Sequence, residues 1–259
     1  MELSDFVIQK EEDFHTQADA SNTNVVFVKA DLLKPFLELR MLGLRPKVLI
    51  SGNGDTNFPE PILLDKCIQL FLCQNSLTQN DPRVSTIPIG LENRSLGRSG
   101  IPHYFKHTAH RSLDPHKASL LVPPMSPTNT ARISVLDEIN SINSNSLVVS
   151  KTHLSPKKYF QLVRKFRFIL CLEGNGFDTH RVWESLYLES FPVMIKSLWS
   201  DSLLKLGLPI LVVNNIAEIN EKLLLDFESA HRDFCSKNLE KIWMPYWEKL
   251  ILEACTQVA

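Results

Sequence analysis

The stretch Phe168–Ile195, FILCLEGNGFDTHRVWESLYLESFPVMI, contains the pattern that decides the fold. An apolar run, Phe168–Leu172, leads through a Gly-containing polar segment into a helical pattern, and a second apolar run follows at Phe191–Ile195. Strand, turn, helix and strand in this order make a βαβ unit, which is typical of a parallel sheet. The stretch therefore predicts an α/β protein.

Polar and glycine residues gather in the turn of this unit, at the carboxyl end of its first strand. Open α/β sheets bind ligands at that edge, and backbone N–H groups at a helix start attract phosphate. Arg181 is suited to a two-pronged hydrogen bond with a diphosphate. The alternative is a polar loop with a helix cap, which Asp178 or Thr179 would supply. The number of polar and Gly residues exceeds what capping requires, which favours a ligand site.

The composition is that of an ordinary globular protein, with 44% hydrophobic and 22% charged residues among 259. A net charge of −1 gives no reason to expect a nucleic-acid or anionic-membrane partner. The chain opens on a polar, acidic segment, and no apolar run approaches the roughly 20 residues of a membrane helix. We therefore expect a cytoplasmic protein without a signal peptide or transmembrane segment.

Cysteine and histidine spacing argues against a metal site. The five cysteines are odd in number and form no CxxC pair, which indicates reduced thiols rather than a disulfide framework. The eight histidines show no HExxH spacing. We expect no protein-bound metal.

Short apolar runs alternate with helical patterns along almost the whole chain, as in parallel sheets covered by helices on both faces. The predicted strands are residues 25–28, 47–51, 85–89, 119–122, 147–149, 168–172, 192–195 and 209–213. The predicted helices are residues 32–42, 62–73, 131–141, 156–166, 179–188, 200–206, 217–227 and 237–255.

A long polar segment, residues 90–115, interrupts this alternation and has the composition of a domain junction. One continuous sheet is the alternative. The break favours two Rossmann-like, doubly wound halves, residues 1–113 and 114–235, followed by a C-terminal helix within 236–259. A core-packing stripe is predicted in that last segment by residues at helical spacing, namely Trp243, Tyr246, Trp247, Leu250 and Ile251.

Three polar loops follow predicted strand ends and are expected to face a cleft. They are Ser51–Asp55, Ser126–Thr130 with Arg132, and Glu173–Arg181. Any one of them is ordinary turn chemistry. Three at equivalent strand ends indicate a binding site.

Phe168–Ile195 resembles the nucleotide-sugar-binding segment of exostosin-like glycosyltransferases. The matching positions are Phe168, Leu170, Cys171, Glu173, Gly174, Gly176, Asp178, Thr179, Arg181, Trp183, Glu184, Ser185, Leu186, Pro192 and Val193. Weaker similarity extends the resemblance over about residues 45–220. The family usually has Gly where this chain has Ser190, and the first half of this chain is short.

The resemblance implies a GT-B-like arrangement, in which the second domain holds a nucleoside-diphosphate sugar and the first holds a glycan or other hydroxyl acceptor. The nucleotide sugar is a co-substrate, and no further cofactor is implied. The donor-binding candidates are Asn129, Arg132, Glu173, Gly174, Asn175, Gly176, Asp178, Thr179, Arg181 and Glu184. Among these, Glu184 follows Arg181 by about one helical turn and is expected to accept the ribose hydroxyls.

The inverting stereochemistry that the resemblance implies requires a base to deprotonate the acceptor. Asp55, the acid in the loop of the opposite half, is the first candidate, and His180 is the alternative. A binding protein that kept the cleft but lost catalysis is the main competing interpretation. A dinucleotide oxidoreductase is disfavoured because Thr179 stands where the third Gly of G-x-G-x-x-G would be.

Overall fold

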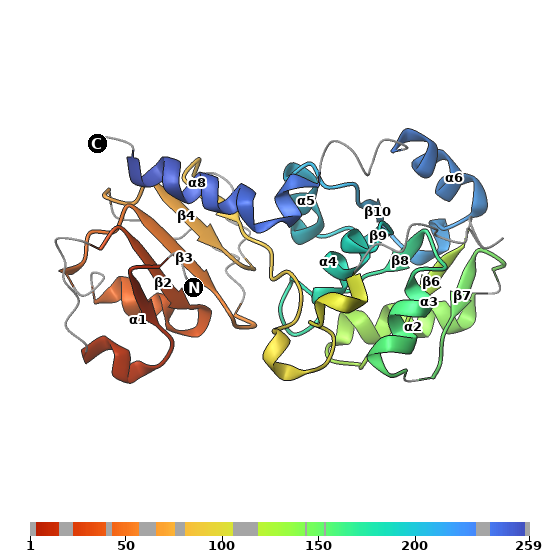
Figure 1. The fold of residues 1–259 in the computed structure, drawn as a ribbon. Coiled ribbons are helices and arrows are strands. Elements are labelled where there is room, and N and C mark those ends of the chain that lie inside the picture. The colour runs from red at the N-terminus through yellow and green to blue at the C-terminus, as the bar shows by residue number, and fades with distance from the viewer. Residues whose placement is uncertain are drawn as a thin grey trace. The chain divides into compact units, whose positions relative to one another are not determined.

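The computed structural model describes residues 4–15, 23–39, 43–56, 66–75, 81–105, 119–142, 144–152, 154–231 and 239–256 (Figure 1). The chain divides into two compact units, Met1–Ile89 with Trp243–Ala259, and Gly90–Ile242. Each unit has a parallel sheet, with five strands in the described part of the chain. The protein is therefore α/β with two Rossmann-like units, which confirms the predicted fold class.

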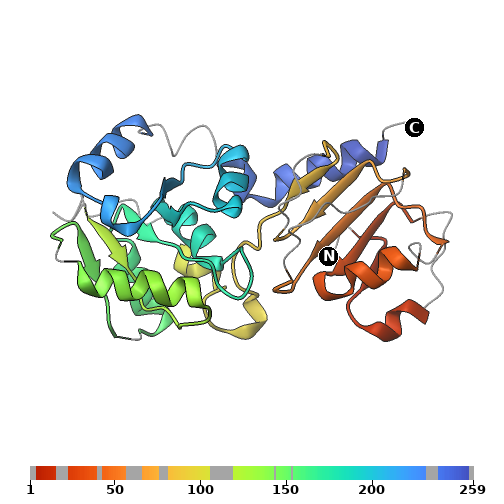
Figure 2. The same cartoon turned by 180° about the vertical axis from the view of Figure 1, so that it is seen from behind.

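The first unit is built on the strand order β1-β2-β3-β4-β5, so its strands follow one another as they do in the sequence. Its core contains apolar residues of the strands together with Leu33 and Phe36 of α1. The C-terminal helix α8 packs against β3, and both ribbon views show it alongside this sheet (Figures 1 and 2). The elements are β1 (Phe6–Ile8), η1 (Glu11–His15), β2 (Val25–Lys29), η2 (Ala30–Leu32), α1 (Leu33–Glu38), β3 (Val48–Gly52), β4 (Leu70–Cys73), β5 (Val84–Thr86) and α8 (Met244–Thr256).

The second unit has the strand order β10-β9-β8-β6-β7. Its central strands are fully apolar, and the rings of Phe168 and Phe191 lie 5.4 Å apart on neighbouring strands. The elements are η4 (Arg94–Leu96), η5 (Pro102–Phe105), β6 (Leu120–Val122), α2 (Thr130–Ser141), β7 (Leu147–Val149), α3 (Pro156–Val163), β8 (Phe168–Leu170), α4 (His180–Tyr187), β9 (Phe191–Ile195), α5 (Leu198–Lys205), β10 (Leu211–Val213), η6 (Ile216–Glu218), α6 (Glu221–Ala230) and η7 (Glu240–Ile242).

The direction in which strands are added reverses in this second sheet. The chain passes from β6 outward to β7, and then returns to place β8 on the other side of β6. Ligands of open α/β sheets bind beyond the carboxyl ends of the strands at such a reversal. The loops that follow β6 and β8 are therefore the expected location of a site.

Two elements differ from the sequence prediction. The described end of the helix predicted over 62–73 is strand β4, paired with β3 and β5, and residues 62–65 lie outside the described part. Leu70–Cys73 is a continuous apolar run buried in the sheet, and such a run has no period that separates strand from helix. Strand β1, Phe6–Ile8, was not predicted because three residues show no pattern.

The division of the chain also differs from the boundaries predicted by composition. Residues 90–105 belong to the second unit, where Tyr104 and Phe105 pack against Phe160 at ring distances of 5.2 and 4.8 Å. The predicted boundary at 113/114 lies outside the described residues. Helix α8 belongs to the first unit, so this unit is formed from both ends of the chain.

The stripe predicted for the C-terminal helix is partly correct. Trp247 and Ile251 are buried on α8, whereas Trp243 precedes the helix and is half exposed. The bond from Lys47 Nζ to the carbonyl of Cys255, 2.7 Å long, joins the end of this helix to the residue before β3. Within the described residues, no helix is both long and apolar enough to span a membrane.

Candidate functional site

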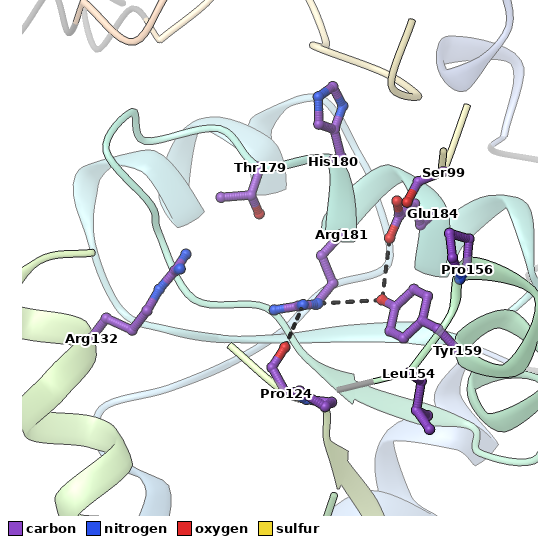
Figure 3. A pocket seen from close by; sticks show the side chains of 10 residues that line it. All are labelled: Ser99, Pro124, Arg132, Leu154, Pro156, Tyr159, Thr179, His180, Arg181 and Glu184. Carbon is purple, nitrogen blue, oxygen red and sulfur yellow. Dashed lines mark hydrogen bonds between the residues drawn. The ribbon is translucent and has the colours of Figure 1, made fainter. Parts of the chain in front are cut away.

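A cavity of about 340 Å³ lies in the second unit, at the start of α4 (Figure 3). This volume is within the range of small-molecule sites, roughly 300–1,000 Å³. Its lining comes from the loops after β6, β7 and β8 and from α2, α3 and α4, together with one residue from the segment before β6. The lining residues are Ser99, Pro124, Arg132, Leu154, Pro156, Tyr159, Thr179, His180, Arg181 and Glu184.

The start of α4 opens into this cavity without a side-chain cap. The side chain of Thr179 makes no capping hydrogen bond, whereas α2, α5 and α6 are each capped by Asn or Ser. The N–H of Val182 donates to the carbonyl of Thr179 at 3.2 Å, while the N–H groups of His180 and Arg181 precede the first i→i−4 bond of the helix. The positive end of the α4 dipole is therefore available to an anion.

His180, the first residue of α4, has its orientation set by the backbone. Its Nδ1 lies 2.8 Å from the carbonyl oxygen of Gly90. A carbonyl only accepts, so Nδ1 must carry the proton. In the neutral ring, Nε2 then keeps its lone pair and can accept a proton or a hydrogen bond.

Arg181 extends its side chain along the cavity wall. Its Nη2 donates to the carbonyl of Pro124 at 3.0 Å, and its Nε donates to the hydroxyl of Tyr159 at 3.3 Å. None of the ion pairs among the described residues involves this guanidinium. Burial lowers the pKa of Arg181, but the nearby Tyr159, Cys171 and Glu184 outweigh burial and the pKa is raised. Arg181 is thus a cation without a direct counter-ion.

Arg132, in the first turn of α2, is 9% exposed and is held by three backbone carbonyls. Its Nε donates to Glu173, Nη1 to Ser126 and Nη2 to Leu172, at 2.9 to 3.0 Å. Burial and the charge of Arg181 lower the pKa of this guanidinium. Two guanidinium groups that repel each other in one cavity wall make a strongly positive environment, which suits an anionic ligand.

Glu184 is the acidic group of the cavity and is 6% exposed. Its Oε2 accepts a hydrogen bond from the hydroxyl of Tyr159 at 3.2 Å. Burial raises the pKa of Glu184, and the charge of Arg181 opposes the shift. The sequence-based expectation that Arg181 and Glu184 share one face of a helix agrees with this arrangement, because both line the same cavity.

Several other predicted donor-binding residues shape the loop after β8 and do not line the cavity. Asn129 caps α2, since its Oδ1 accepts from the N–H of Arg132, and its Nδ2 donates to the carbonyls of Glu173 and Gly174. The N–H of Gly174 donates to the carbonyl of Gly176. A Cβ at Gly174 would lie 3.3 Å from Nη2 of Arg132, a tight contact that would require this side chain to shift by a few tenths of an ångström.

Acidic residues of the same loop have partners within the protein. The carboxylate of Asp178 is 5% exposed and accepts from Nε1 of Trp183 at 2.8 Å. Glu173 accepts from the hydroxyl of Ser197 at 2.6 Å, and burial raises its pKa against that bond. Asn175 is exposed at the tip of the loop.

Asp55, the predicted base, belongs to the first unit. It follows β3 with an exposed side chain, and the cavity is formed by residues of the second unit.

Tyr159 is among the lining residues that sequence reasoning missed, and it hydrogen-bonds to both Arg181 and Glu184. It lies on α3, a short helix on which Lys157 and Lys158 precede it. A lone aromatic residue on such a helix carries no signal of a site. Within the described residues, no group of three or more His, Cys, Asp or Glu side chains is arranged to hold a metal ion.

No protein-family model and no curated protein sequence matches the chain. Among solved structures, the chain is similar to one described as "Trehalose-6-phosphate from E. coli bound with UDP-2-fluoro glucose". The TM-score is 0.49 and the identity 12%, over 91% of this chain and 73% of that chain. A similarity of this size carries no information about the reaction, which must be inferred from the cavity.

Proposed function

We propose that this chain is a glycosyltransferase that moves a sugar from a nucleoside diphosphate to a hydroxyl group of a glycan or glycoconjugate. The observation that carries the proposal is the cavity at the uncapped start of α4, lined by Arg132, Arg181 and a single buried carboxylate. The exostosin-like relationship is part of the proposal. It is supported by the motif in Phe168–Ile195.

The positive part of the cavity suits the diphosphate. Breaking the bond between a sugar and a diphosphate places negative charge on the departing phosphate, and preorganised donors stabilise that charge. Arg181 and the first N–H groups of α4 would supply these donors, while Arg132 adds its field. Because these groups are cationic or dipolar, we propose that donor binding requires no divalent cation.

Glu184 suits the ribose. A carboxylate can accept hydrogen bonds from two neighbouring hydroxyls, and the α4 geometry places Glu184 close to Arg181. The donor nucleotide would therefore lie with its diphosphate toward Arg181 and its ribose toward Glu184.

We further propose that transfer inverts the anomeric centre, which requires a base for the acceptor hydroxyl. His180 is favoured by its bond to Gly90, which leaves the lone pair on Nε2. Asp55, which has an exposed side chain in the first unit, is the second candidate.

The test measures release of nucleoside diphosphate from UDP-glucose and GDP-mannose, with a panel of glycan acceptors and with water alone. If the chain is a glycosyltransferase, it releases nucleoside diphosphate when a suitable acceptor is present. The His180→Ala variant should then release it about 100-fold more slowly or worse, while its affinity for the donor changes little. Asp55→Asn is measured in parallel. If Asp55→Asn is the variant that loses turnover, the base is Asp55. Tight donor binding without any release would instead indicate a binding protein without catalysis.

Chelator provides the control for the metal-free part of the proposal. Binding and release should be unchanged in EDTA. If EDTA abolishes donor binding or nucleoside-diphosphate release, and manganese or magnesium restores it, the proposal of metal-free binding is contradicted.

A further inference from the structure

The hydroxyl of Tyr159 lies between the two charged groups that would grip the donor. It donates to Oε2 of Glu184 at 3.2 Å and accepts from Nε of Arg181 at 3.3 Å (Figure 3). An ionised carboxylate only accepts and a guanidinium only donates, so the direction of both bonds is determined. The Arg181 guanidinium also lies over the Tyr159 ring, 5.9 Å from its centroid.

This bridge stands where the helical spacing of Arg181 and Glu184 would also allow a direct ion pair. An Arg and a Glu three residues apart on one helix normally meet directly. In a site this buried, a direct pair would occupy the polar atoms of both groups. Tyr159 instead gives each group one bond and leaves the remaining oxygen of Glu184 and the remaining N–H groups of Arg181 for other partners.

We propose that Tyr159 is a positioning residue, which keeps Arg181 and Glu184 apart and directed toward the diphosphate and ribose of a nucleoside-diphosphate ligand. The inference rests on the proposed function, because it assigns the ligand of that same cavity. Tyr159 acts through its two partners and need not contact the ligand.

A second consequence concerns the ionisation of Glu184. The charged and titratable groups around it are Arg181 and His180 on α4, Tyr159 on α3, Cys171 after β8, and Glu92 from the segment before η4. The Tyr159 bond favours the carboxylate and so opposes burial. Without this hydroxyl, the pKa of Glu184 rises further, and the carboxylate is lost at a higher pH.

The experiment is calorimetric titration of the full chain and of Tyr159→Phe with UDP-glucose and GDP-mannose from about pH 5 to pH 8. Both probes carry a diphosphate esterified at each end, so neither has the phosphate proton that titrates near pH 6. Tyr159→Phe should bind about tenfold more weakly at neutral pH. Its acid-side loss of affinity should begin at a higher pH than in the unmodified chain.

Two controls separate positioning from a general loss of stability. Tyr187→Phe removes a phenol hydroxyl from the same unit, where it bonds to the carbonyl of Ile242, and should leave affinity and pH profile unchanged. In a Glu184→Gln background, the effect of Tyr159→Phe should shrink, because interacting residues give non-additive changes.

If the unmodified chain binds a probe but Tyr159→Phe matches it in affinity and pH profile, the positioning role is overturned and the proposed function stands. If the unmodified chain binds neither probe nor free UDP or GDP, the proposed function is overturned and the inference with it.

Discussion

Arg132 and Arg181 line one cavity but are held in different ways. Arg132 uses three donor nitrogens on backbone carbonyls of two loops, so its main effect is to hold those loops together. Arg181 uses one donor on a carbonyl and one on a hydroxyl, and keeps further N–H groups for a ligand. At the residue scale, Arg181 is therefore the residue we propose as the direct diphosphate contact, and Arg132 the one we propose as its support.

The buried carboxylate of Glu184 predicts a pH-dependent stability difference. Burial raises its folded-state pKa above the ordinary value of 4.5, so the folded chain holds this proton more tightly than the unfolded chain. The resulting stability is present below about pH 4.5 and is lost as the pH rises through the folded-state value. Glu184→Gln should accordingly gain free energy of unfolding relative to the unmodified chain between pH 4 and pH 7.

Urea unfolding at a series of pH values provides the measurement. Glu221→Gln, on the exposed surface of α6, controls for the loss of one carboxylate. A difference between Glu184→Gln and the unmodified chain that is the same at pH 4 and pH 7 would contradict the role of burial.

Individual side chains show where sequence reasoning succeeds. The joint placement of Arg181 and Glu184 follows from helical spacing, which is a local property. The hydrogen-bond partner of Asp178 cannot be predicted in this way, because an aspartate at this position could cap a helix, bind a ligand or accept a hydrogen bond from an indole. The burial of Trp183 brings its Nε1 to Asp178, and only tertiary packing reveals that contact.

At the scale of elements, the start of α2 and the loop after β8 behave as one structure. Asn129 caps α2 through Oδ1 and holds the carbonyls of Glu173 and Gly174 through Nδ2. The loop that leads into α4 is therefore anchored to a different helix. This anchoring explains how a segment with two glycines can present a defined site.

Asn129→Ala should lower both stability and donor affinity. Losing the cap costs about 1 kcal/mol of unfolding free energy. Releasing the Gly174 loop should also weaken UDP or GDP binding severalfold, because the start of α4 is less well positioned. Thermal or urea unfolding and calorimetric titration measure the two effects.

Asn220→Ala is a matched control, since Asn220 caps α6 in the same way through the N–H of Leu223. This variant should lose similar stability and keep its affinity. Equal affinities for the Asn129 and Asn220 variants would show that the anchor does not matter for the site.

Elements also show why prediction from sequence is incomplete. Apolar runs that alternate with helical patterns predict the strands of the second sheet. These include β8 and β9, which precede and follow helix α4 in the sequence. Strand β4 was wrongly predicted as the end of a helix, because a buried run can satisfy helical spacing by chance. Ser190, which stands where the exostosin-like pattern usually has Gly, fits the buried position because its hydroxyl donates to the carbonyl of Phe166.

At the scale of the whole molecule, the chain combines two parallel α/β units, and the described cavity belongs to the second. The first unit is completed by α8 from the far end of the chain, a long-range contact that no local pattern predicts. The reversal of strand order that locates the cavity is likewise a property of the complete sheet.

The central claim is that the cavity at the start of α4 binds a nucleoside diphosphate through Arg181 and Glu184. Calorimetric titration of the unmodified chain with UDP, GDP and their sugar conjugates tests it most directly, alongside Arg181→Ala, Glu184→Ala and the exposed control Arg45→Ala. Saturable binding should weaken by about 10- to 100-fold in Arg181→Ala, which corresponds to roughly 1.5–3 kcal/mol. Glu184→Ala should weaken the binding of free nucleoside diphosphates and of their sugar conjugates alike. Arg45→Ala should change neither affinity. Unchanged affinities in folded Arg181→Ala and Glu184→Ala, or no binding by the unmodified chain, would contradict the claim.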